Sequence, residues 1–476
     1  MLTAAVAAEL AGGRLIQGDG ATAITGFGWD SRQVRAGQLF IAVRGERVDG
    51  HEYVAAAVAA GAMGALVGRP VASPGVLILV DDPVLALGRM GAAWLRRYPV
   101  PVVGITGSVG KTTTKEMAWA VLSQRFKTLR NLGNLNSEIG LPVTLFELDE
   151  SYQAAVLEMG MRAKGEIRHL VGIAPPSVAV VTNVGLSHLE LLGSQAAIAE
   201  AKAELVQGLR PGGTAVLNAD DPRVAAMHAR TPGPVTFYGI GLTPGRAAAL
   251  RGGGPAGWVG AFDLRPAGTP DAPATAFRLA GHAGEAAVLL PAPGEHNVLG
   301  ALGAAGAGLA LGLSPAEAAA GLAHYAPAGN RMRIRRAGSW RLLDDTYNAA
   351  PDSTVAALKV LRELAGGGRA VAVLGSMYEL GAAAAAGHRR VGEAAAACAD
   401  LLVCVGEPEL AGEVPGGARA AGLPADRVHY FATKVAAAAA LPELLRRNDT
   451  ILVKGSRGMQ MEEIVALLEN IAIRFV

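Results

Sequence analysis

Residues 102–116 read VVGITGSVGKTTTKE, an apolar run followed by a glycine-rich turn, a lysine and three threonines. The apolar run predicts a buried strand, and the segment that begins KTTTKEMAWAVL predicts a helix. A strand, a glycine loop and a helix in this order present backbone N–H groups and the positive helix end to a polyphosphate. Lys111 can then reach the terminal phosphates, and Thr112 can ligate Mg²⁺. We therefore expect a nucleoside triphosphate site at this loop.

The spacing of this loop departs from the common pattern Gly-x-x-x-x-Gly-Lys, because Ile105 stands where the first glycine is usual. A guanine-specific switch would need an Asn-Lys-x-Asp segment, which the sequence lacks. A motor would usually have an apolar strand that ends in acidic residues. The strand-like AAVLEMGM carries the single Glu158, which is either a second Mg²⁺ contact or an ordinary strand-end carboxylate. The class of nucleotide-using protein stays open at this point.

A second polar cluster follows the apolar run of SVAVVTNVGLSHLE, residues 177–190. Asn183, His188 and Glu190 come directly after this predicted strand, where the sites of α/β proteins gather. A single histidine is more often structural than a ligand, but its place after a strand end makes a functional role of His188 equally plausible. The pattern leaves both interpretations of His188 open.

The helix predicted over residues 196–209 carries a lysine on its apolar face. Ile198, Leu205 and Val206 flank Lys202 at helical spacing, whereas Glu200 and Glu204 fall on the opposite face. One interpretation is a side chain that extends along the apolar stripe to solvent. The other is a buried lysine that loses its charge and adds CO₂ to become an anionic carbamate. The sequence does not decide between the two.

Composition narrows the classes of function. The chain has 476 residues and a net charge of +2, so no global field predicts nucleic-acid or anionic membrane binding. Cys398 and Cys404 form neither a disulfide framework nor a zinc spacing, and Glu9 interrupts the apolar N-terminus. The uncharged stretch 297–316 is rich in alanine and glycine and predicts a packed core helix. We expect a cytoplasmic, monomeric protein without membrane insertion.

Alternating strand-like and helix-like runs predict an α/β fold with parallel sheets covered by helices. We expect a small α/β N-terminal domain over residues 1–82 and a central P-loop ATPase-type domain with a parallel sheet over 83–328. A C-terminal Rossmann-like α/β domain is expected over 329–476. Within the central region, the glycine- and proline-rich residues 239–295 predict turns and short antiparallel strands.

Several longer motifs resemble those of the Mur ligases of peptidoglycan synthesis, and the resemblance covers nearly the full chain. The segments that carry it are DSRQVRAGQLFIAVRGERVDGHEYV (30–54), TGSVGKTTTKE, NLGNLNSEIGLPVTL (131–145), LEMGMRAKGEI, TNVGLSHLELLGS, AKAEL, GEHNVLGALGAAGAGLALG (294–312), NRMR (330–333), DDTYNAAPDSTVAAL (344–358), VLGSMYELG (373–381) and ILVKGSRGMQMEEIV (451–465). Within the family, DDTYNAAP and KGSRGMQME favour the branch that adds D-alanyl-D-alanine.

The resemblance implies a role for each matching position. The residues that would bind ATP are Gly107, Ser108, Val109, Gly110, Lys111, Thr112, Thr113, Asn297, Arg331 and Asp345. The residues that would hold two Mg²⁺ ions are Thr112, Glu158, His188 and Lys202 as a carbamate. The UDP-sugar would be bound by Ser31 and Arg32 together with the GERVDGH loop. The sugar-peptide would contact Asn134 and Asn136, and the dipeptide would lie near Tyr347 and Asn348. Lys111, Glu158, His188 and Lys202 would form the catalytic group.

The implied reaction is ADP-forming amide ligation of D-alanyl-D-alanine to UDP-N-acetylmuramoyl-tripeptide through an acyl phosphate. Within ligases, the alternatives are another Mur ligase or an enzyme similar to folylpolyglutamate synthetase. The DSR and GERVDGH segments favour a UDP-sugar over a folate. A P-loop switch or motor is the alternative from a different class, and the missing base-reading and motor patterns disfavour it.

Overall fold

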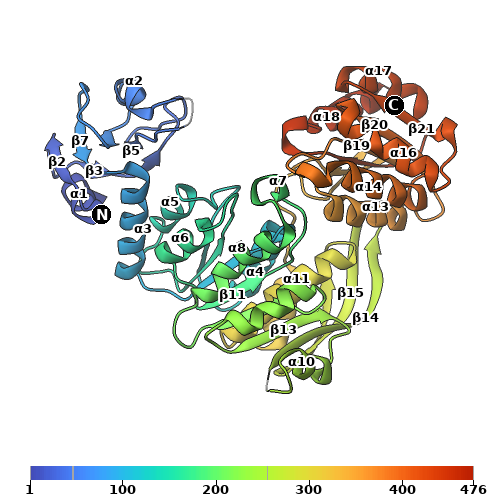
Figure 1. Ribbon diagram of the computed structural model, residues 1–476, viewed down its shortest axis with the longest axis horizontal. Helices are drawn as coiled ribbons and strands as arrows, with labels where there is room; N and C mark the ends of the chain where they lie inside the picture. The colour runs from blue at the N-terminus through green and yellow to red at the C-terminus, as the bar shows by residue number, and fades with distance from the viewer. Residues whose placement is uncertain (1, 46–47, 255, 475–476) are drawn as a thin grey trace. The chain divides into compact units, whose positions relative to one another are not determined.

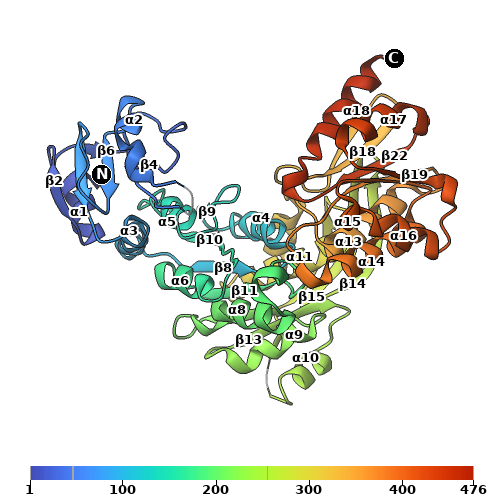
Figure 2. The same cartoon turned by 45° about the horizontal axis from the view of Figure 1, so that its top comes forward.

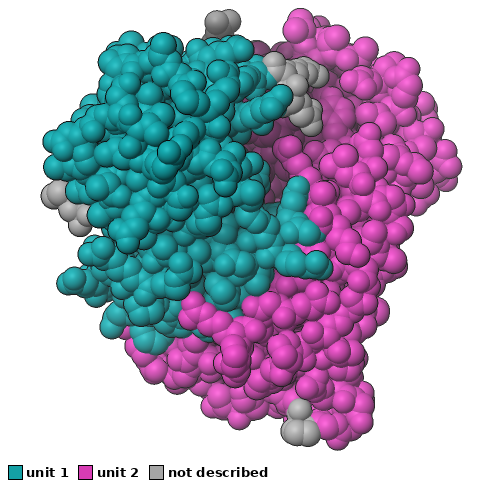
Figure 3. Space-filling model, turned by 60° about the vertical axis from the view of Figure 1, so that its left-hand side comes forward, with its two compact units in different colours: residues 1–104, 126–161, 165–177 teal, residues 105–125, 162–164, 178–476 magenta. Residues whose placement is uncertain are grey.

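The computed structural model describes residues 2–45, 48–254 and 256–474 (Figure 1). Two compact units, shown in different colours in Figure 3, divide the chain. Unit 1 contains residues 1–104, 126–161 and 165–177, and unit 2 contains residues 105–125, 162–164 and 178–476. These limits follow a different criterion from the domain limits predicted at residues 82 and 328, which remain predictions.

The first part of unit 1 is a small α/β layer. Its sheet has the order β2-β7-β6-β5-β4, in which β4 to β7 are parallel and β2 is antiparallel to β7. Leu39, Phe40 and Ile41 of β5 are fully buried, as expected for a strand covered on both faces. The elements are β1 (Leu2–Thr3), α1 (Ala4–Ala11), β2 (Arg14–Gln17), β3 (Ala23–Ile24), β4 (Gly26–Gly28), β5 (Gln38–Ile41), η1 (Gly50–Tyr53), α2 (Val54–Ala59), β6 (Gly64–Val67) and β7 (Val76–Leu79).

The remainder of unit 1 packs on this layer through aromatic side chains. The rings of Phe27 and Phe146 lie 4.4 Å apart, and Trp94 lies 5.3 Å from Phe146. The indole Nε1 of Trp94 donates to the carbonyl of Leu148 at 3.0 Å, so its polar edge is satisfied although the ring is buried. The elements are α3 (Pro83–Arg97), β9 (Thr128–Arg130), α5 (Gly140–Leu145), β10 (Ala154–Glu158) and α6 (Glu166–Ile173), while β8 (Val102–Thr106) crosses the boundary between the units.

Unit 2 continues with a sheet that is parallel from β11 to β14 and antiparallel from β14 to β16. The elements are α4 (Lys111–Leu122), β11 (Val178–Val181), α7 (Leu189–Leu192), α8 (Gln195–Gln207), β12 (Thr214–Asn218), α9 (Pro222–Ala225), η2 (Ala226–Arg230), β13 (Val235–Ile240), α10 (Pro244–Leu250), β14 (Gly257–Thr269), β15 (Ala272–Gly281), β16 (Gly284–Leu290), α11 (Glu295–Ala310) and α12 (Pro315–Ala323).

The antiparallel strands predicted within residues 239–295 are present, but two of them are long. β14 has 13 residues and β15 has 10, and helix α10 precedes them. Pro266 concealed the length of β14 in the sequence. β13 pairs with β14 only as far as Ala261, so beyond that point β14 has β15 as its partner and the missing N–H of Pro266 disrupts no second ladder.

The uncharged stretch 297–316 contains most of α11, a buried helix that packs closely on its neighbours. A Cβ atom at Gly306 would lie 2.8 Å from Val216, and one at Gly308 would lie 2.6 Å from Val121. These small residues allow close approach of helix and sheet. Within residues 2–45, 48–254 and 256–474, no helix is long and apolar enough to span a membrane.

The last part of unit 2 is a doubly wound layer with the sheet order β17-β18-β22-β19-β20-β21. Figures 1 and 2 show α13, α14 and α16 on one face and α17 and α18 on the other, and a separate apolar cluster fills each interface. The elements are β17 (Arg333–Ala337), β18 (Trp340–Asp345), α13 (Pro351–Ala365), β19 (Ala370–Gly375), η3 (Gly381–Ala383), α14 (Ala384–Cys398), β20 (Leu401–Val405), α15 (Pro408–Ala411), α16 (Glu413–Ala420), η4 (Ala425–Arg427), β21 (Val428–Phe431), α17 (Lys434–Leu444), β22 (Thr450–Lys454), η5 (Arg457–Met459) and α18 (Glu462–Arg474).

Substitution of Gly321 tests the packing of α12 on α4, the helix that follows the phosphate loop. A Cβ atom there would lie 2.4 Å from the Cα of Val121 and 2.7 Å from the carbonyl of Ala120, both in the backbone. We expect Gly321→Ala to destabilise the protein by ~1–3 kcal/mol through overpacking. Calorimetry should show a lower unfolding midpoint. Gly416→Ala is the control, because Gly416 is exposed within α16 and a Cβ there has open space. Equal midpoints for Gly321→Ala and the unmodified protein would contradict this packing.

Candidate functional site

Gly107 shapes the tight turn after β8, where any side chain would require its neighbours to shift. Ile105 is a fully buried residue of this strand, which ends at Thr106. A Cβ atom at Gly107 would lie 1.8 Å from the Oγ1 atom of Thr182. Position 107 therefore provides the tight turn, and Ile105 belongs to the strand before it.

Hydrogen bonds from the segment after β11 hold the loop. The N–H of Ser108 donates to the Asn183 carbonyl at 3.0 Å, and the N–H of Val109 donates to Asn183 Oδ1 at 3.0 Å. The carbonyl of Val109 accepts from Thr182 Oγ1 at 2.7 Å and from Asn183 Nδ2 at 2.9 Å. Bonds within the chain thus hold the loop in its shape.

The loop has the properties of a polyphosphate site. Gly110 has a φ of 81°, and a Cβ there would meet none of the described atoms within 4 Å. The hydroxyl of Ser108 is buried without a hydrogen-bond partner among the described residues. Lys111 begins α4 and donates to the carbonyls of Gly107 at 2.9 Å and Ser108 at 3.3 Å. An open face, a spare hydroxyl, a helix N-terminus and an ammonium group together fit an anionic ligand.

Glu158 ends β10 in unit 1 and is buried. Asn131 accepts from its N–H and donates to its carbonyl, both at 2.9 Å. Asn136 Nδ2 donates to Glu158 Oε1 at 2.8 Å. The structure therefore brings Asn136 and Glu158 together, whereas Asn134 lies exposed on the same segment.

Lys202 is 1% exposed within α8, so its side chain does not extend to solvent. Burial lowers the pKa of its amine well below the usual value, and repulsion from Lys111 adds to this shift. Glu200 pairs with Arg230 at the surface. Glu204 is also buried, although it was predicted on the face opposite Lys202. This environment favours the neutral form of the Lys202 amine over the charged one.

His188 precedes α7 and adopts a φ of 65°. Its Nδ1 atom lies 2.8 Å from Oε2 of Glu379, which belongs to the SMYELG segment. The interaction with the His188 ring lowers the pKa of Glu379, and the charge of Arg162 contributes further. His188 and Glu379 are 191 positions apart in the sequence, and only the fold brings them together.

The predicted metal ligands are divided between the units. Glu158 belongs to unit 1, and Thr112, His188 and Lys202 belong to unit 2. In the described part of the chain, no three His, Cys, Asp or Glu side chains lie together as a metal-binding group. The predicted set includes a threonine and a lysine carbamate, so it stays a prediction.

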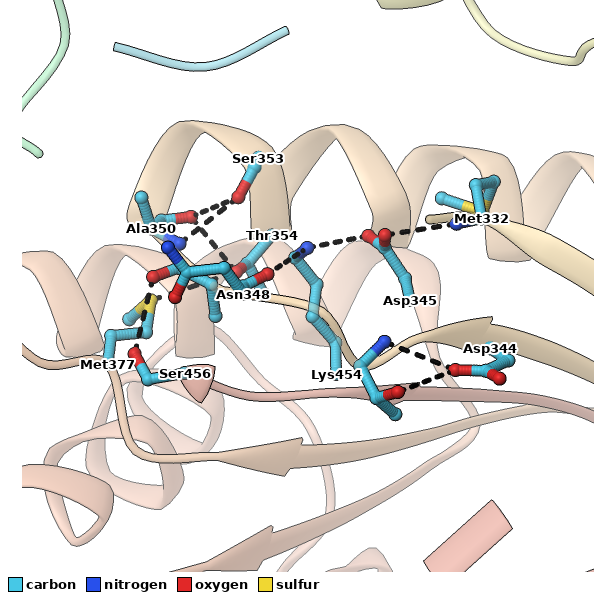
Figure 4. Close-up of polar contacts among 12 residues, drawn as sticks. Met332, Asp344, Asp345, Asn348, Ala350, Ser353, Thr354, Met377, Lys454 and Ser456 are labelled. Atoms are coloured by element: carbon cyan, nitrogen blue, oxygen red, sulfur yellow. Dashed lines mark hydrogen bonds and ion pairs between the residues drawn. The ribbon is translucent and has the colours of Figure 1, made fainter. Parts of the chain in front are cut away.

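Asp345 is the centre of a buried polar cluster in the last part of unit 2 (Figure 4). Lys454 Nζ lies 2.6 Å from its Oδ2 atom and also donates to the Asn348 carbonyl at 2.9 Å. The N–H of Met332 donates to Asp345 Oδ1 at 3.0 Å. Asp345 therefore connects the end of β18 to the end of β22 and to the segment that follows Gly329.

Arg331 and Tyr347 form a stacked pair beside this cluster. The guanidinium carbon of Arg331 lies 3.7 Å from the ring centroid of Tyr347. Asn297 is buried near the start of α11 and donates to the Pro293 carbonyl at 2.7 Å. Burial lowers the pKa of the neighbouring His296 to about 4, so this imidazole is neutral at physiological pH.

The residues predicted to hold the sugar nucleotide lie in the first part of unit 1. Arg32 is 84% exposed and pairs with Asp30 at 2.8 Å, and Ser31 is half-buried beside it. In the GERVDGH loop, residues 46–47 lie outside the described residues. His51 accepts at Nε2 from the N–H of Gly68 at 2.8 Å, which braces the end of that loop.

A parallel sheet, a preformed phosphate loop and a buried lysine near that loop define an α/β protein of the nucleotide-binding P-loop class. Family models then match most of the chain: the Mur ligase middle domain over residues 105–308, the Mur ligase glutamate ligase domain over 330–457 and the Mur ligase family catalytic domain over 23–80. The chain belongs to the Mur ligase family. The α/β fold predicted from the sequence is confirmed.

Individual relatives cover nearly the whole chain. The UDP-N-acetylmuramoyl-tripeptide--D-alanyl-D-alanine ligase of Bacillus subtilis (strain 168) is 36% identical over 448 residues, 93% of each chain. A crystal structure of MurF from Acinetobacter baumannii is 32% identical, covers 98% of both chains and has a TM-score of 0.86. MurF from Thermotoga maritima, solved in complex with ADP, is 27% identical with a TM-score of 0.79 and covers 96% of this chain and 99% of that one.

Sequence reasoning did not select three residues that organise the site. Thr182 holds the phosphate loop together with Asn183, which the sequence had placed in a polar cluster, and Lys454 and Glu379 pair with predicted site residues. Thr182 and Lys454 each lie at or just after the end of a strand, which was the available signal. For Glu379 the sequence offered none beyond its place in a family motif.

Removal of the Lys454 ammonium tests the Asp345 cluster. Lys454 is 3% exposed and Asp345 is 14% exposed, so Lys454→Met leaves a nearly buried carboxylate without its cation. We expect a loss of ~3–5 kcal/mol in the free energy of unfolding, measured by denaturant titration. Asp345→Asn in the same chain removes the uncompensated charge and should restore part of that loss. The double variant would contradict the role of the pair if it were no more stable than Lys454→Met.

Proposed function

We propose that this protein is an ATP-dependent ligase that joins D-alanyl-D-alanine to UDP-N-acetylmuramoyl-tripeptide and releases ADP and phosphate. The reaction belongs to the synthesis of peptidoglycan precursors. The observation that carries the proposal is the match to a ligase named for this reaction over 93% of both chains. The preformed phosphate loop supports the ATP-binding part.

The chemistry proceeds in two substitutions. The terminal carboxylate of the tripeptide attacks the γ-phosphorus of ATP, the bond from that phosphorus to the β,γ-bridging oxygen breaks, and ADP leaves. The amine of D-alanyl-D-alanine then attacks the acyl phosphate carbon. A tetrahedral intermediate forms, the amine loses a proton, and inorganic phosphate leaves as the amide bond is completed.

The protein must bring two anions together, the carboxylate and the triphosphate. Positive groups that are already in place lower the cost of this step, since they need no rearrangement during the reaction. Lys111 and the N-terminal amides of α4 are placed for this role. Ser108 contributes a buried hydroxyl that lacks a partner among the described residues.

Mg²⁺ would supply further charge neutralisation and would orient the phosphates. Thr112, Glu158, His188 and a carbamate formed on Lys202 would hold two such ions. Burial of Lys202 supports the carbamate, because a neutral amine adds CO₂ whereas an ammonium does not. The carbamate also converts a buried base, whose charged neighbour is Lys111, into an oxygen ligand.

The remaining residues would bind the organic parts of the substrates. ATP would contact Gly107, Val109, Gly110, Thr113, Asn297, Arg331 and Asp345. The UDP-sugar would contact Ser31 and Arg32, and the sugar-peptide would contact Asn134 and Asn136. The dipeptide would contact Tyr347 and Asn348. Tyr347 is covered by Arg331, and Asn348 is held by Lys454, so both already lie in an ordered polar cluster.

An omission assay tests the proposed reaction. We expect phosphate release only when ATP, UDP-N-acetylmuramoyl-tripeptide and D-alanyl-D-alanine are all present, because the acyl phosphate needs both organic substrates to turn over. Tripeptides with lysine or diaminopimelate at the third position should both be supplied. Mass spectrometry should detect the pentapeptide product. Rapid ATP hydrolysis without the organic substrates would favour a switch or motor instead.

Lys202→Ala tests the carbamate. We expect ATP binding to persist and amide formation to fall on the order of 100-fold or more, because a ligand of the metal ions is lost. In ¹³C-bicarbonate, the unmodified protein should show a carbamate carbon resonance that the variant lacks. Lys359→Ala, on the exposed face of α13, should retain both properties. Full ligase activity of Lys202→Ala would exclude the carbamate role.

A further inference from the structure

The peptide group that joins Asn183 to Val184 is held on both of its sides. Its carbonyl accepts from the N–H of Ser108 at 3.0 Å, and its N–H donates to Oδ2 of Asp221 at 2.7 Å. The N–H and C=O of a trans peptide group lie in one plane and point in opposite directions. This peptide group therefore connects the carboxylate of Asp221, 37 positions from Val184 in the sequence, to the phosphate loop.

The peptide group before Asn183 is held from the same segment of the chain. Nδ2 of Asn218 donates to the Thr182 carbonyl at 2.8 Å, and this hydrogen bond is buried. Asn218 and Asp221 thus fix the peptide groups on both sides of Asn183, and this restricts its two backbone torsions. From this backbone the side chain of Asn183 reaches Val109 with both Oδ1 and Nδ2.

Asp221 uses both of its carboxylate oxygens as acceptors. Oδ1 caps α9 by accepting from the N–H groups of Arg223 at 2.9 Å and Val224 at 3.3 Å, and Oδ2 accepts from Val184. A carboxylate can accept at both oxygens, whereas an amide side chain has one acceptor oxygen. A charged acceptor also polarises the peptide group to which it is bonded, and this strengthens the carbonyl that accepts from Ser108.

We propose that Asp221 is a positioning residue of the nucleotide site, which fixes the shape of the phosphate loop through the peptide group between Asn183 and Val184. Asp221 is itself an anion, so its contribution reaches a polyphosphate through this peptide group and the N–H of Ser108. The ligand class is the polyphosphate part of a nucleotide, which fits the loop and Lys111. The identity of that nucleotide as ATP rests on the proposed function.

Calorimetric titration of the full chain with ATP and Mg²⁺, and separately with inorganic tripolyphosphate, tests this role. Asp221→Asn keeps the size of the side chain and one acceptor oxygen. That oxygen should remain on the two cap N–H groups and leave Val184 without its acceptor. We expect both dissociation constants to rise on the order of 10-fold, by the same factor, because the loop meets the phosphates. Unchanged affinities in Asp221→Asn would overturn the proposal.

Asp82→Asn is the matched control. Asp82 caps α3 through Oδ1, which accepts from the N–H groups of Val84 at 2.8 Å and Leu85 at 2.9 Å. Asparagine caps a helix about as well as aspartate does, so both dissociation constants should keep their wild-type values. An equal loss of affinity in Asp82→Asn would overturn the proposal, because the effect would then not depend on the contact with Val184.

Asn183→Ala tests the route by which Asp221 acts. This substitution removes the two side-chain bonds to Val109. In the Asn183→Ala background, Asp221→Asn should weaken tripolyphosphate binding by a smaller factor than it does alone, since part of the loop is already released. Fully additive effects of the two substitutions would contradict this route.

Kinetics separate positioning of the loop from a general structural role. In the ligase reaction, Asp221→Asn should raise KM for ATP by the factor seen in the titration and leave KM for D-alanyl-D-alanine unchanged. Equal changes in the two KM values would count against the proposal. A wild-type protein that binds ATP but forms no pentapeptide would contradict the proposed function, whereas the comparison of dissociation constants would stand.

Discussion

The close approach of Gly107 to Thr182 is the constraint on which the nucleotide side of the molecule depends. Because a side chain at position 107 would force Thr182 to shift, glycine favours the turn at this position, and the loop that follows contacts Asn183. α4 then begins at Lys111, and its opposite end is fixed by glycine contacts from α11 and α12. Bonds within the chain thus fix the orientation of the loop, as electrostatic stabilisation requires.

Two buried lysines show how their surroundings decide the chemistry of one residue type. Lys454 is 3% exposed and lies against the carboxylate of Asp345, so its charge is compensated. Lys202 is 1% exposed, has Lys111 as its charged neighbour, and has a lowered pKa. Burial without an opposite charge favours the neutral amine, whereas burial with one favours the ion pair. One lysine therefore forms a structural ion pair, whereas the other is a candidate reactive amine.

The sequence predicted those structural features that depend on residues close together in the chain. The phosphate loop, α8 and the apolar surroundings of Lys202 follow from spacing over a few turns, because strand and helix periodicity are local properties. The Lys454–Asp345 and His188–Glu379 pairs join residues 109 and 191 positions apart, and spacing contains no information about them. The sequence did not reveal the length of β14. A proline at position 266 is compatible with a strand only because β13 stops pairing with β14 before that point.

Some of the ion pairs between the last part of unit 2 and its middle part are partly exposed. Glu379 is 51% exposed in its pair with His188, and Asp271, at the tip of the β14–β15 hairpin, is 52% exposed in its pairs with Arg336 and Arg341. Exposed pairs contribute only ~0–1 kcal/mol each because solvent screens them. Such contacts can orient side chains without locking the parts together. That balance suits the proposed ligase reaction, in which water must be excluded from an acyl phosphate and the product must then be released in every cycle.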